Sequence, residues 1–260
     1  MIIIPGGGYA YVAGGYEGAD WAPFYNDLGF TAAVLTYNLP NGNPEVPLND
    51  GRAALQYLRD HAEELHIEPD LIGVMGFSAG GHLASTIATH LTGSELPAFQ
   101  ILYYPVITMD SRYTHAGSRE NLLGSNPSDE LVELYSSDKQ VTAETPPAYL
   151  CWASDDSTVK PTNSLMYKKA LTNAGVSVKN RTFASGGHGF GFKTTFTYHT
   201  QMVQHLTNWL LGLDEIITGI DNRLQTIDNG VQAIYNLAGQ RVMNPQHGIY
   251  IMQGKKVLIK

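Results

Sequence analysis

The sequence predicts an α/β fold in which a mostly parallel sheet is covered by helices on both faces. Short apolar runs alternate along the chain with segments whose apolar residues recur at helical spacing. Clusters of Gly, Pro and Asn separate these segments. Such alternation favours a parallel sheet, because each crossover helix returns the chain to the same end of the sheet.

The predicted elements follow in strand–helix order. Apolar runs indicate strands at residues 1–4, 30–37, 71–75, 98–108, 147–154 and 176–183. Helical spacing indicates helices at residues 17–29, 50–66, 81–91, 128–135, 161–173 and 194–211. We expect Asn49 or Asp50 to cap the second helix, with Tyr57 and Leu58 on its inner face. The irregular insertion at 109–146 is expected to form part of a substrate wall.

The composition excludes several classes of partner. With 260 residues, 43% of them hydrophobic, the chain can hold one sizeable domain and a small extra module. A formal net charge of -8 without a basic stripe argues against nucleic acid as a partner. No apolar run is long enough to span a membrane. The single cysteine, Cys151, lies in an apolar run and is expected to be a buried hydrophobe.

The pentapeptide Gly76-Phe77-Ser78-Ala79-Gly80 is the feature on which the functional prediction depends. It follows an apolar strand and precedes a helical segment, the context of a nucleophile elbow. Ser78 is then exposed at the apex of a sharp turn, and the flanking glycines avoid clashes with the strand and the helix.

A serine hydroxyl needs a base to become a nucleophile, and the base needs an acid that orients it. His188 follows the last strand in a glycine-rich loop, and either Asp155 or Asp156 follows the strand before it. We prefer Asp156, which stands three residues before Val159, and expect Asp155 to be a turn residue or an N-terminal cap.

The tetrahedral intermediate of acyl transfer needs amide donors for its oxyanion. Gly7 and Gly8, which follow the first strand, can present backbone N–H groups, and Ala79 supplies the N–H next to the nucleophile. Tyr9 beside these glycines and His115 in the insertion are candidate substrate contacts. This chemistry requires neither a cofactor nor a metal.

Together these motifs resemble the α/β-hydrolase superfamily, and in particular its esterase/lipase branch with acetylxylan and feruloyl esterases. The segments that carry the resemblance are Pro5-Gly6-Gly7-Gly8-Tyr9, residues 76–82, Asp156-x-x-Val159 and Gly187-His188-Gly189, within residues 1–212. The resemblance implies Gly7 and Gly8 in the oxyanion hole, and Ser78, Asp156 and His188 as nucleophile, acid and base. Lipase-like relatives carry histidine where this chain has Pro5.

The implied activity is that of a serine carboxylester hydrolase. Its substrate would be a small ester or an acylated plant polysaccharide that loses acetyl or feruloyl groups. One alternative is a serine peptidase of the prolyl-oligopeptidase-like group, whose elbows also carry an extra glycine like Gly81. Another is a non-catalytic binding protein on a hydrolase frame.

Family members have strands before the oxyanion strand, which opens this chain. The resemblance therefore implies a truncated or trimmed N-terminus, with the strand at 30–37 left as an exposed sheet edge. Such an edge predicts aggregation or edge pairing between copies.

The last part of the chain differs in character from residues 1–213, the predicted catalytic domain. Residues 214–230 resemble a linker, and residues 231–260 contain short β-type runs typical of a small meander. This tail resembles the C-terminal sorting region of type IX-secreted bacterial proteins. That resemblance implies a secreted, periplasmic or cell-surface protein, whereas the missing signal peptide leaves a cytoplasmic protein as the alternative.

Overall fold

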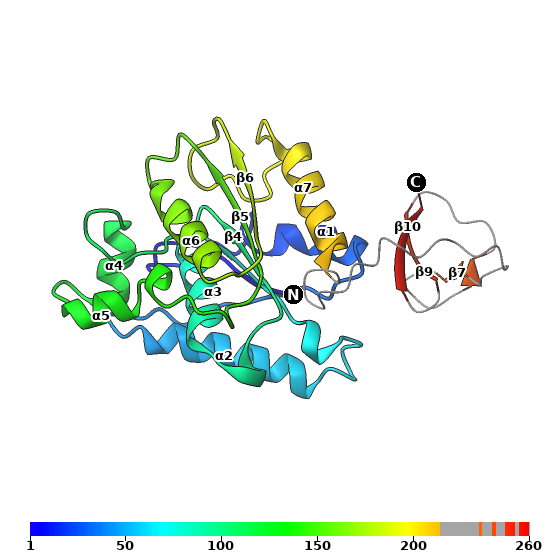
Figure 1. The fold of residues 1–260 in the computed structure, drawn as a ribbon, viewed down its shortest axis with the longest axis horizontal. Coiled ribbons are helices and arrows are strands. Elements are labelled where there is room, and N and C mark those ends of the chain that lie inside the picture. The colour runs from blue at the N-terminus through cyan, green and yellow to red at the C-terminus, as the bar shows by residue number, and fades with distance from the viewer. Residues whose placement is uncertain (214–233, 236–240, 243–247, 253–254, 260) are drawn as a thin grey trace.

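Six parallel strands form the central sheet of this computed structural model. The structure describes residues 1–213 and four short strands at 234–235, 241–242, 248–252 and 255–259. The strand order in the central sheet is β2-β1-β3-β4-β5-β6, with every pair parallel (Figure 1). The strands are β1 (Ile2–Ile4), β2 (Ala33–Val34), β3 (Val74–Phe77), β4 (Gln100–Tyr103), β5 (Ala148–Ala153) and β6 (Val178–Phe183). The predicted parallel α/β architecture is thereby confirmed.

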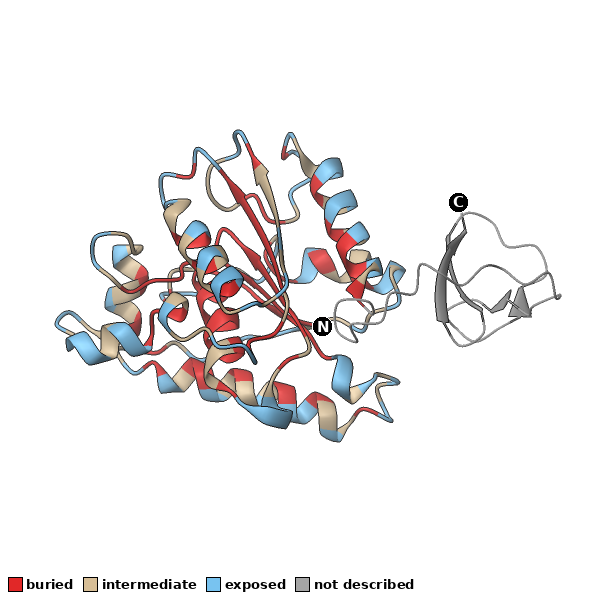
Figure 2. Cartoon of the chain, viewed as in Figure 1, coloured by how far each residue is buried: buried red, intermediate tan, exposed pale blue. Residues whose placement is uncertain are grey.

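Helices connect the strands and cover the sheet. The α-helices are α1 (Ala22–Asp27), α2 (Glu45–Asp60), α3 (Ser78–His90), α4 (Ala116–Leu123), α5 (Asp129–Leu134), α6 (Thr162–Asn173) and α7 (His199–Leu211). Short 3-10 helices lie at Ala19–Trp21, Pro69–Leu71, Gly93–Glu95 and Ser137–Lys139. Strands β3, β4 and β5 are buried along their whole length, and exposed residues gather on the outer faces of the helices (Figure 2).

The two faces of β3 show that α1 and α3 lie on opposite sides of the sheet. Met75 accepts a hydrogen bond at its sulfur from the Tyr25 hydroxyl of α1, at 3.0 Å. A Cβ on the next residue, Gly76, would lie 2.8 Å from the Ala84 side chain of α3. Because successive residues of a strand point to opposite faces, the sheet is covered on both sides.

Helices α6 and α7 also divide between the two faces. Tyr149 of β5 is in register with the Met75 row of the sheet and packs on Trp209 of α7, with ring centroids 5.5 Å apart. Helix α7 therefore shares the α1 face. On the other face, the Tyr167 hydroxyl of α6 donates to the Gln100 side chain of β4 at 3.0 Å.

Several predicted elements differ in extent from the structure. The helix expected at 17–29 is limited to a 3-10 turn and α1, the strand expected at 98–108 is limited to β4, and the helix expected at 194–211 begins at His199. The strand expected at 30–37 is limited to β2. Its residues are half-buried or exposed, because among the described strands β2 pairs with β1 alone and forms the edge of the sheet. The expected edge is therefore present, and self-association along it stays a prediction.

Helix α2 begins at Glu45 instead of at Asn49 or Asp50. Asp50 instead accepts the backbone N–H of Asn38 at 2.6 Å. Tyr57 is 57% exposed, because the buried face of this helix contains Leu55 and Leu58.

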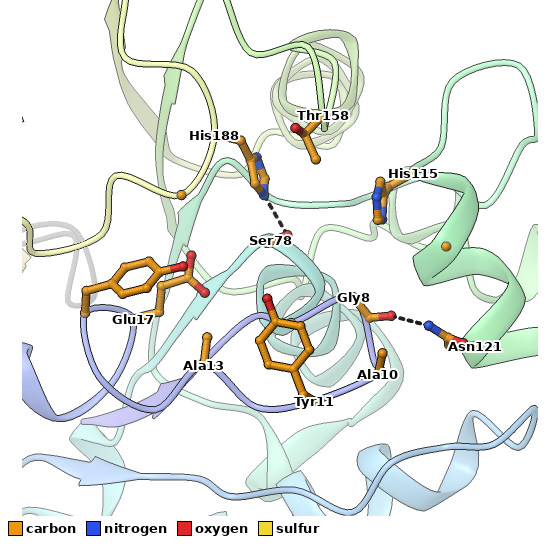
Figure 3. A pocket seen from close by; sticks show the side chains of 14 residues that line it. Gly8, Ala10, Tyr11, Ala13, Glu17, Ser78, His115, Asn121, Thr158 and His188 are labelled. Carbon is orange, nitrogen blue, oxygen red and sulfur yellow. Dashed lines mark hydrogen bonds between the residues drawn. The ribbon is translucent and has the colours of Figure 1, made fainter.

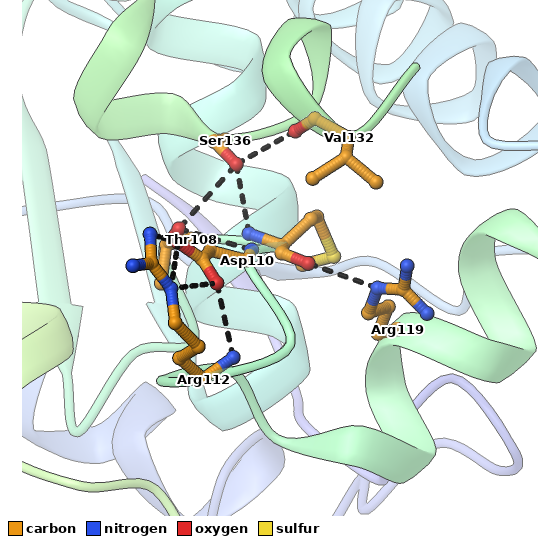
Figure 4. A network of polar contacts seen from close by, with 7 residues as sticks. Thr108, Asp110, Arg112, Arg119, Val132 and Ser136 are labelled. Atoms are coloured by element: carbon orange, nitrogen blue, oxygen red, sulfur yellow. Dashed lines mark hydrogen bonds and ion pairs between the residues drawn. The ribbon is translucent and has the colours of Figure 1, made fainter. Parts of the chain in front are cut away.

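The insertion after β4 folds into α4 and α5 and is held against the core by polar contacts (Figure 4). The Ser136 hydroxyl accepts the Met109 N–H at 2.8 Å and donates to the Val132 carbonyl at 2.7 Å. Arg119 of α4 donates from Nε to the Met109 carbonyl at 2.9 Å. These contacts fix α4, which was not predicted as a helix, beside the carboxyl end of the sheet.

The described strands of the tail form a separate antiparallel sheet. They are β7 (Ile234–Tyr235), β8 (Arg241–Val242), β9 (Gly248–Met252) and β10 (Lys255–Ile259), in the order β10-β9-β7-β8. The expected β-type runs are thus present, but β9 pairs with β7, so the sheet is not a simple meander. The predicted linker at 214–230 lies outside the described residues, and the domain division stays a prediction.

Candidate active site

Ser78 occupies the turn between β3 and α3 in a backbone conformation that is rare for serine. Its φ is +52°, in the left-handed region. The flanking glycines are required by close backbone approaches: a Cβ on Gly76 would lie 2.2 Å from the Gly80 carbonyl oxygen, and one on Gly80 would lie 2.2 Å from the Ile4 carbonyl oxygen. The turn therefore has the strained geometry expected of a nucleophile elbow.

The structure brings Ser78, His188 and Asp156 into one hydrogen-bonded chain. The distance from His188 Nε2 to Ser78 Oγ is 2.9 Å, and that from His188 Nδ1 to Asp156 Oδ2 is 2.7 Å. Asp156 is buried, and its Oδ1 accepts the N–H groups of Thr158 and Val159 at 2.9 and 3.0 Å. With Nδ1–H donating to the carboxylate, Nε2 is left to accept the Ser78 proton.

The neighbouring residue, Asp155, lies in a turn, which is one of the two expected alternatives, and its carboxylate bonds the loop before His188. It accepts the N–H groups of Gly186 and Gly187 at 3.2 and 2.8 Å. It therefore anchors the loop that carries His188 and does not cap the following helix, α6. The hydrogen bond from Gly187 is the main reason why the pKa of Asp155 is lowered from 3.8.

The loop after β1, residues 5–9, is called the oxyanion loop here. It turns sharply beside Ser78. Gly7 and Gly8 have φ values of +126° and +63°, and a Cβ on Gly7 would lie 2.0 Å from the Tyr11 carbonyl oxygen. In residues 1–213, the N–H groups of Gly7 and Gly8 donate to no protein acceptor. Ala79 follows Ser78 in the first turn of α3, where N–H groups have no partner within the helix. All three amides are thus available to a ligand.

A pocket of about 360 Å³ opens above Ser78 (Figure 3). The pocket is lined by residues of the oxyanion loop and the segment that follows it, of α4 and of the loops that carry Asp156 and His188. Among them are Gly7, Gly8, Tyr11, Glu17, His115, Asn121, Thr158, His188 and Gly189. His115, at the start of α4, points into this pocket (Figure 3), and its contact with substrate stays a prediction.

Tyr9, the other candidate substrate contact, lies away from the pocket. It is 2% exposed, and its hydroxyl is 2.8 Å from Nδ1 of His82. The side chain of Tyr9 turns inward because this residue has a φ of +60°, directly after two glycines with positive φ. It supports the oxyanion loop from the core side.

The tautomer of His115 is fixed by its neighbours. Its Nδ1 accepts the N–H of Ser118 at 3.2 Å and is 2.8 Å from the Ser118 hydroxyl. Since Nδ1 is an acceptor, the proton of the neutral ring is on Nε2. Burial is the main cause that lowers the pKa of His115 from 6.5, which keeps the ring neutral.

Several residues in or beside the pocket were missed by sequence reasoning, among them Glu17, Tyr104 and Asn121. The buried Glu17 carboxylate lines the pocket and receives the Tyr104 hydroxyl at 2.8 Å, and Asn121 donates from Nδ2 to the Gly8 carbonyl at 2.9 Å. Glu17 was assigned to an amphipathic helix, where a carboxylate is normally solvated. Its position as the first acidic residue after the glycine triplet was the one available signal for it.

The described residues contain no cluster of three or more His, Cys, Asp or Glu side chains that could hold a metal ion. The expectation that no metal or cofactor takes part stays a prediction. In the same part of the chain, no helix has the length and apolarity needed to cross a membrane.

Comparison with known proteins shows the fold family of the chain. Residues 6–192 match the family described as having an alpha/beta hydrolase fold. The chain belongs to this family. A solved structure similar to this alpha/beta hydrolase is the acetyl ester-xyloside bifunctional hydrolase of Caldicellulosiruptor lactoaceticus, with 36% identity, a TM-score of 0.77 and 83% of each chain covered.

Two curated relatives of this alpha/beta hydrolase are longer proteins. An acetylxylan esterase of Xylanibacter ruminicola is 41% identical over 214 residues, which cover 81% of this chain and 45% of the relative. Endo-1,4-beta-xylanase B of Butyrivibrio fibrisolvens is 35% identical over 204 residues, which cover 73% of this chain and 32% of the relative. The chain therefore spans less than half the length of these two relatives.

Proposed function

We propose that this protein is a serine carboxylester hydrolase that removes acetyl groups from acetylated xylan-type polysaccharides. The observation that carries the proposal is the hydrogen-bonded chain from Ser78 Oγ through His188 to the buried Asp156. The acetyl and xylan parts of the proposal are supported by an acetylxylan esterase and an acetyl ester-xyloside hydrolase among the similar proteins.

In the proposed reaction, His188 Nε2 takes the Ser78 proton while Oγ attacks the ester carbonyl carbon. The carbonyl oxygen becomes an oxyanion that accepts hydrogen bonds from the amides of Gly7, Gly8 and Ala79. The tetrahedral intermediate collapses as His188 returns the proton to the sugar oxygen, which leaves as the free alcohol. Water, deprotonated by His188, then attacks the acetyl-enzyme and releases acetate.

Asp156 stabilises the imidazolium that forms in each half-reaction. Its second oxygen is occupied by two backbone N–H groups, so the carboxylate has little freedom to rotate away from His188. We assign His115 to the substrate: with Nδ1 held by Ser118, its Nε2–H can donate to a sugar oxygen near Ser78.

Export of the enzyme is part of the proposal. A polymeric substrate cannot cross a membrane, so an enzyme that acts on intact xylan must meet it outside the cell. The predicted sorting region falls partly on residues outside the described part of the chain. Fractionation of the producing cells tests this point, and an enzyme confined to the cytoplasm would contradict it.

A substrate panel tests the activity. We expect the protein to release acetate from acetylated xylo-oligosaccharides and to cleave p-nitrophenyl acetate faster than longer acyl esters. Feruloylated arabinose esters in the same panel measure the aryl-acyl activity that the sequence also suggested. Cleavage of an aminoacyl-naphthylamide without ester cleavage would indicate a peptidase. The absence of turnover together with no labelling of Ser78 by a fluorophosphonate would indicate a non-catalytic binding protein.

A further inference from the structure

A buried carboxylate lies beneath the oxyanion loop and has no part in the proposed proton relay. The Glu17 side chain is 3% exposed. Its Oε2 accepts the N–H of Gly6 at 2.9 Å, and its Oε1 accepts the Tyr104 hydroxyl at 2.8 Å. Among residues 1–213 no Lys, Arg or His forms an ion pair with it. Such burial is costly for an unpaired carboxylate and calls for a specific role.

Tyr104 connects this carboxylate to the loop that carries His188. Its hydroxyl oxygen accepts the N–H of Gly191 at 2.9 Å while its proton goes to Glu17. Its ring meets the His188 ring edge to face, with centroids 4.7 Å apart. Tyr104 also has a φ of +36°, and strain of this kind at a bulky residue commonly marks a functional position.

Gly6 lies in close contact with both Glu17 and the nucleophile Ser78. A Cβ on Gly6 would lie 2.7 Å from Glu17 Oε2 and 2.9 Å from Ser78 Cβ, so Gly6 is wedged between the two side chains. A displacement of the Glu17 carboxylate would therefore move Gly6, and with it the amides of Gly7 and Gly8 relative to Ser78. One hydrogen-bonded bridge thus reaches the oxyanion loop at one end and the His188 loop at the other.

The hydrogen-bond pattern indicates that Glu17 works as a carboxylate. Both oxygens act as acceptors, from a backbone N–H and from a phenol. The pKa of Glu17 is raised from 4.5 by burial, and the hydrogen bonds from Tyr104 and Gly6 and the charge of protonated His188 oppose this rise. The negative charge of Glu17 therefore attracts the imidazolium that forms during catalysis.

We propose that Glu17 and Tyr104 are positioning residues that hold the oxyanion loop and the His188 loop in register with Ser78. The proposal rests on the function proposed above for Ser78 and His188. It assigns no contact with substrate to Tyr104, which is 1% exposed and does not line the pocket.

Tyr104→Phe is the decisive variant, because it removes the bridging hydroxyl and keeps the ring against His188. We expect kcat on p-nitrophenyl acetate to fall roughly 10-fold to 100-fold, with KM changed less than about threefold, since misplaced groups mainly slow the chemical step. Affinity for a phenylboronic acid, which forms a tetrahedral adduct with an active serine, should fall by a similar factor.

The matched control is Tyr167→Phe. Tyr167 is also a fully buried tyrosine, and its hydroxyl donates to Gln100 on the α6 face of β4, away from the residues that line the pocket. We expect its kcat to stay within about twofold of wild type although its melting temperature falls as much as that of Tyr104→Phe. Equal losses of kcat in the two variants would overturn the proposal, because stability alone would then explain both.

Two Glu17 variants complete the test and remain informative if Tyr104→Phe does not fold. Glu17→Gln keeps the shape and one acceptor, so its kcat should lie between those of wild type and Glu17→Ala. A folded Glu17→Gln and a folded Glu17→Ala with wild-type kcat would overturn the inference while the proposed function stands. A wild-type protein without esterase activity would overturn the proposed function, and this inference with it.

Discussion

Asp155 and Asp156 are adjacent in the sequence but receive different hydrogen bonds. Asp156 accepts hydrogen bonds from His188 Nδ1 and from two amides of its own turn. Asp155 accepts hydrogen bonds from two amides of the loop before His188. The first contact acts on the imidazole directly, and the second acts through the backbone. Substitution of Asp156 should therefore lower kcat far more than substitution of Asp155.

Asp156→Asn should lower kcat on p-nitrophenyl acetate by roughly 10³-fold to 10⁴-fold, because an amide no longer fixes the productive tautomer of the base. Asp155→Asn keeps an acceptor for the Gly186 and Gly187 amides, and we expect a loss below about 10-fold. Steady-state kinetics of both variants check this order. A larger loss in Asp155→Asn would show that the acid has been assigned to the wrong residue.

His115 offers a residue-scale test of how the sugar is bound. His115→Ala should reduce kcat/KM on an acetylated xylo-oligosaccharide about 10-fold, the value of one hydrogen bond of about 1.4 kcal/mol. The rate on p-nitrophenyl acetate, which has no sugar, should change less than about twofold. His205→Ala, an exposed histidine on α7, is the control. Equal losses on both substrates would contradict a role in binding the sugar.

Sequence reasoning at this scale found the three residues of the relay but not their supports. Ser78, Asp156 and His188 were found because each follows a predicted strand in a glycine-rich or acidic turn. Glu17 and Tyr104 are 87 positions apart, and their contact depends on how a loop before α1 packs over the end of β4. No local pattern encodes that packing.

At the scale of elements, the site depends on three chain segments that approach one another at backbone distance. The end of β1, the elbow and the first turn of α3 meet with no room for side chains at Gly76 and Gly80. This tight approach places the oxyanion loop beside Ser78.

Gly80→Ala should lower the free energy of unfolding by at least about 2 kcal/mol, because its Cβ would lie 2.3 Å from the Pro5 carbonyl oxygen. Gly15→Ala is the matched control, since a Cβ there has no atom within 4 Å and its φ is not positive. We expect it to change stability by less than about 0.5 kcal/mol. Urea unfolding of both variants measures the difference, and equal stabilities would refute the steric argument.

The positions of most elements could be predicted, and their ends less well. Strand β5 and helix α6 agree with the predicted segments to within a residue or two, because buried strands and amphipathic helices leave clear periodic patterns. Strand β2 is much shorter than its apolar run, because pairing on one side alone ends where β1 ends. Helix α4 was missed since its short sequence lacks a clear apolar face.

At the scale of the whole molecule, the buried His82 joins three parts of the fold. It lies on α3, bonds the Tyr9 hydroxyl through Nδ1, and donates from Nε2 to the Tyr135 carbonyl at 2.7 Å. Burial is the main cause that lowers the pKa of His82 from 6.5 to about 4. The neutral ring is thus built into the folded state.

Stability should therefore fall on acidification between about pH 6.5 and pH 4. In this range the unfolded chain binds a proton on His82 that the folded chain does not, so unfolding takes up a proton and the free energy of unfolding decreases as pH falls. The lowered pKa of His82 contributes about 3 kcal/mol in full to the pH dependence of the free energy of unfolding. His82→Gln should be less stable at pH 7 but lose less on acidification. Parallel pH dependences of wild type and variant would contradict this assignment.

The central claim, acyl transfer through Ser78, is tested most directly by comparing Ser78→Ala with Ser85→Ala on p-nitrophenyl acetate. Ser85 is a buried serine on the same helix that bonds the His82 carbonyl, outside the pocket. We expect Ser78→Ala to lose activity by up to about a millionfold and to lose its labelling by a fluorophosphonate, whereas Ser85→Ala keeps both. Near-wild-type hydrolysis by a folded Ser78→Ala would show that Ser78 is not the nucleophile.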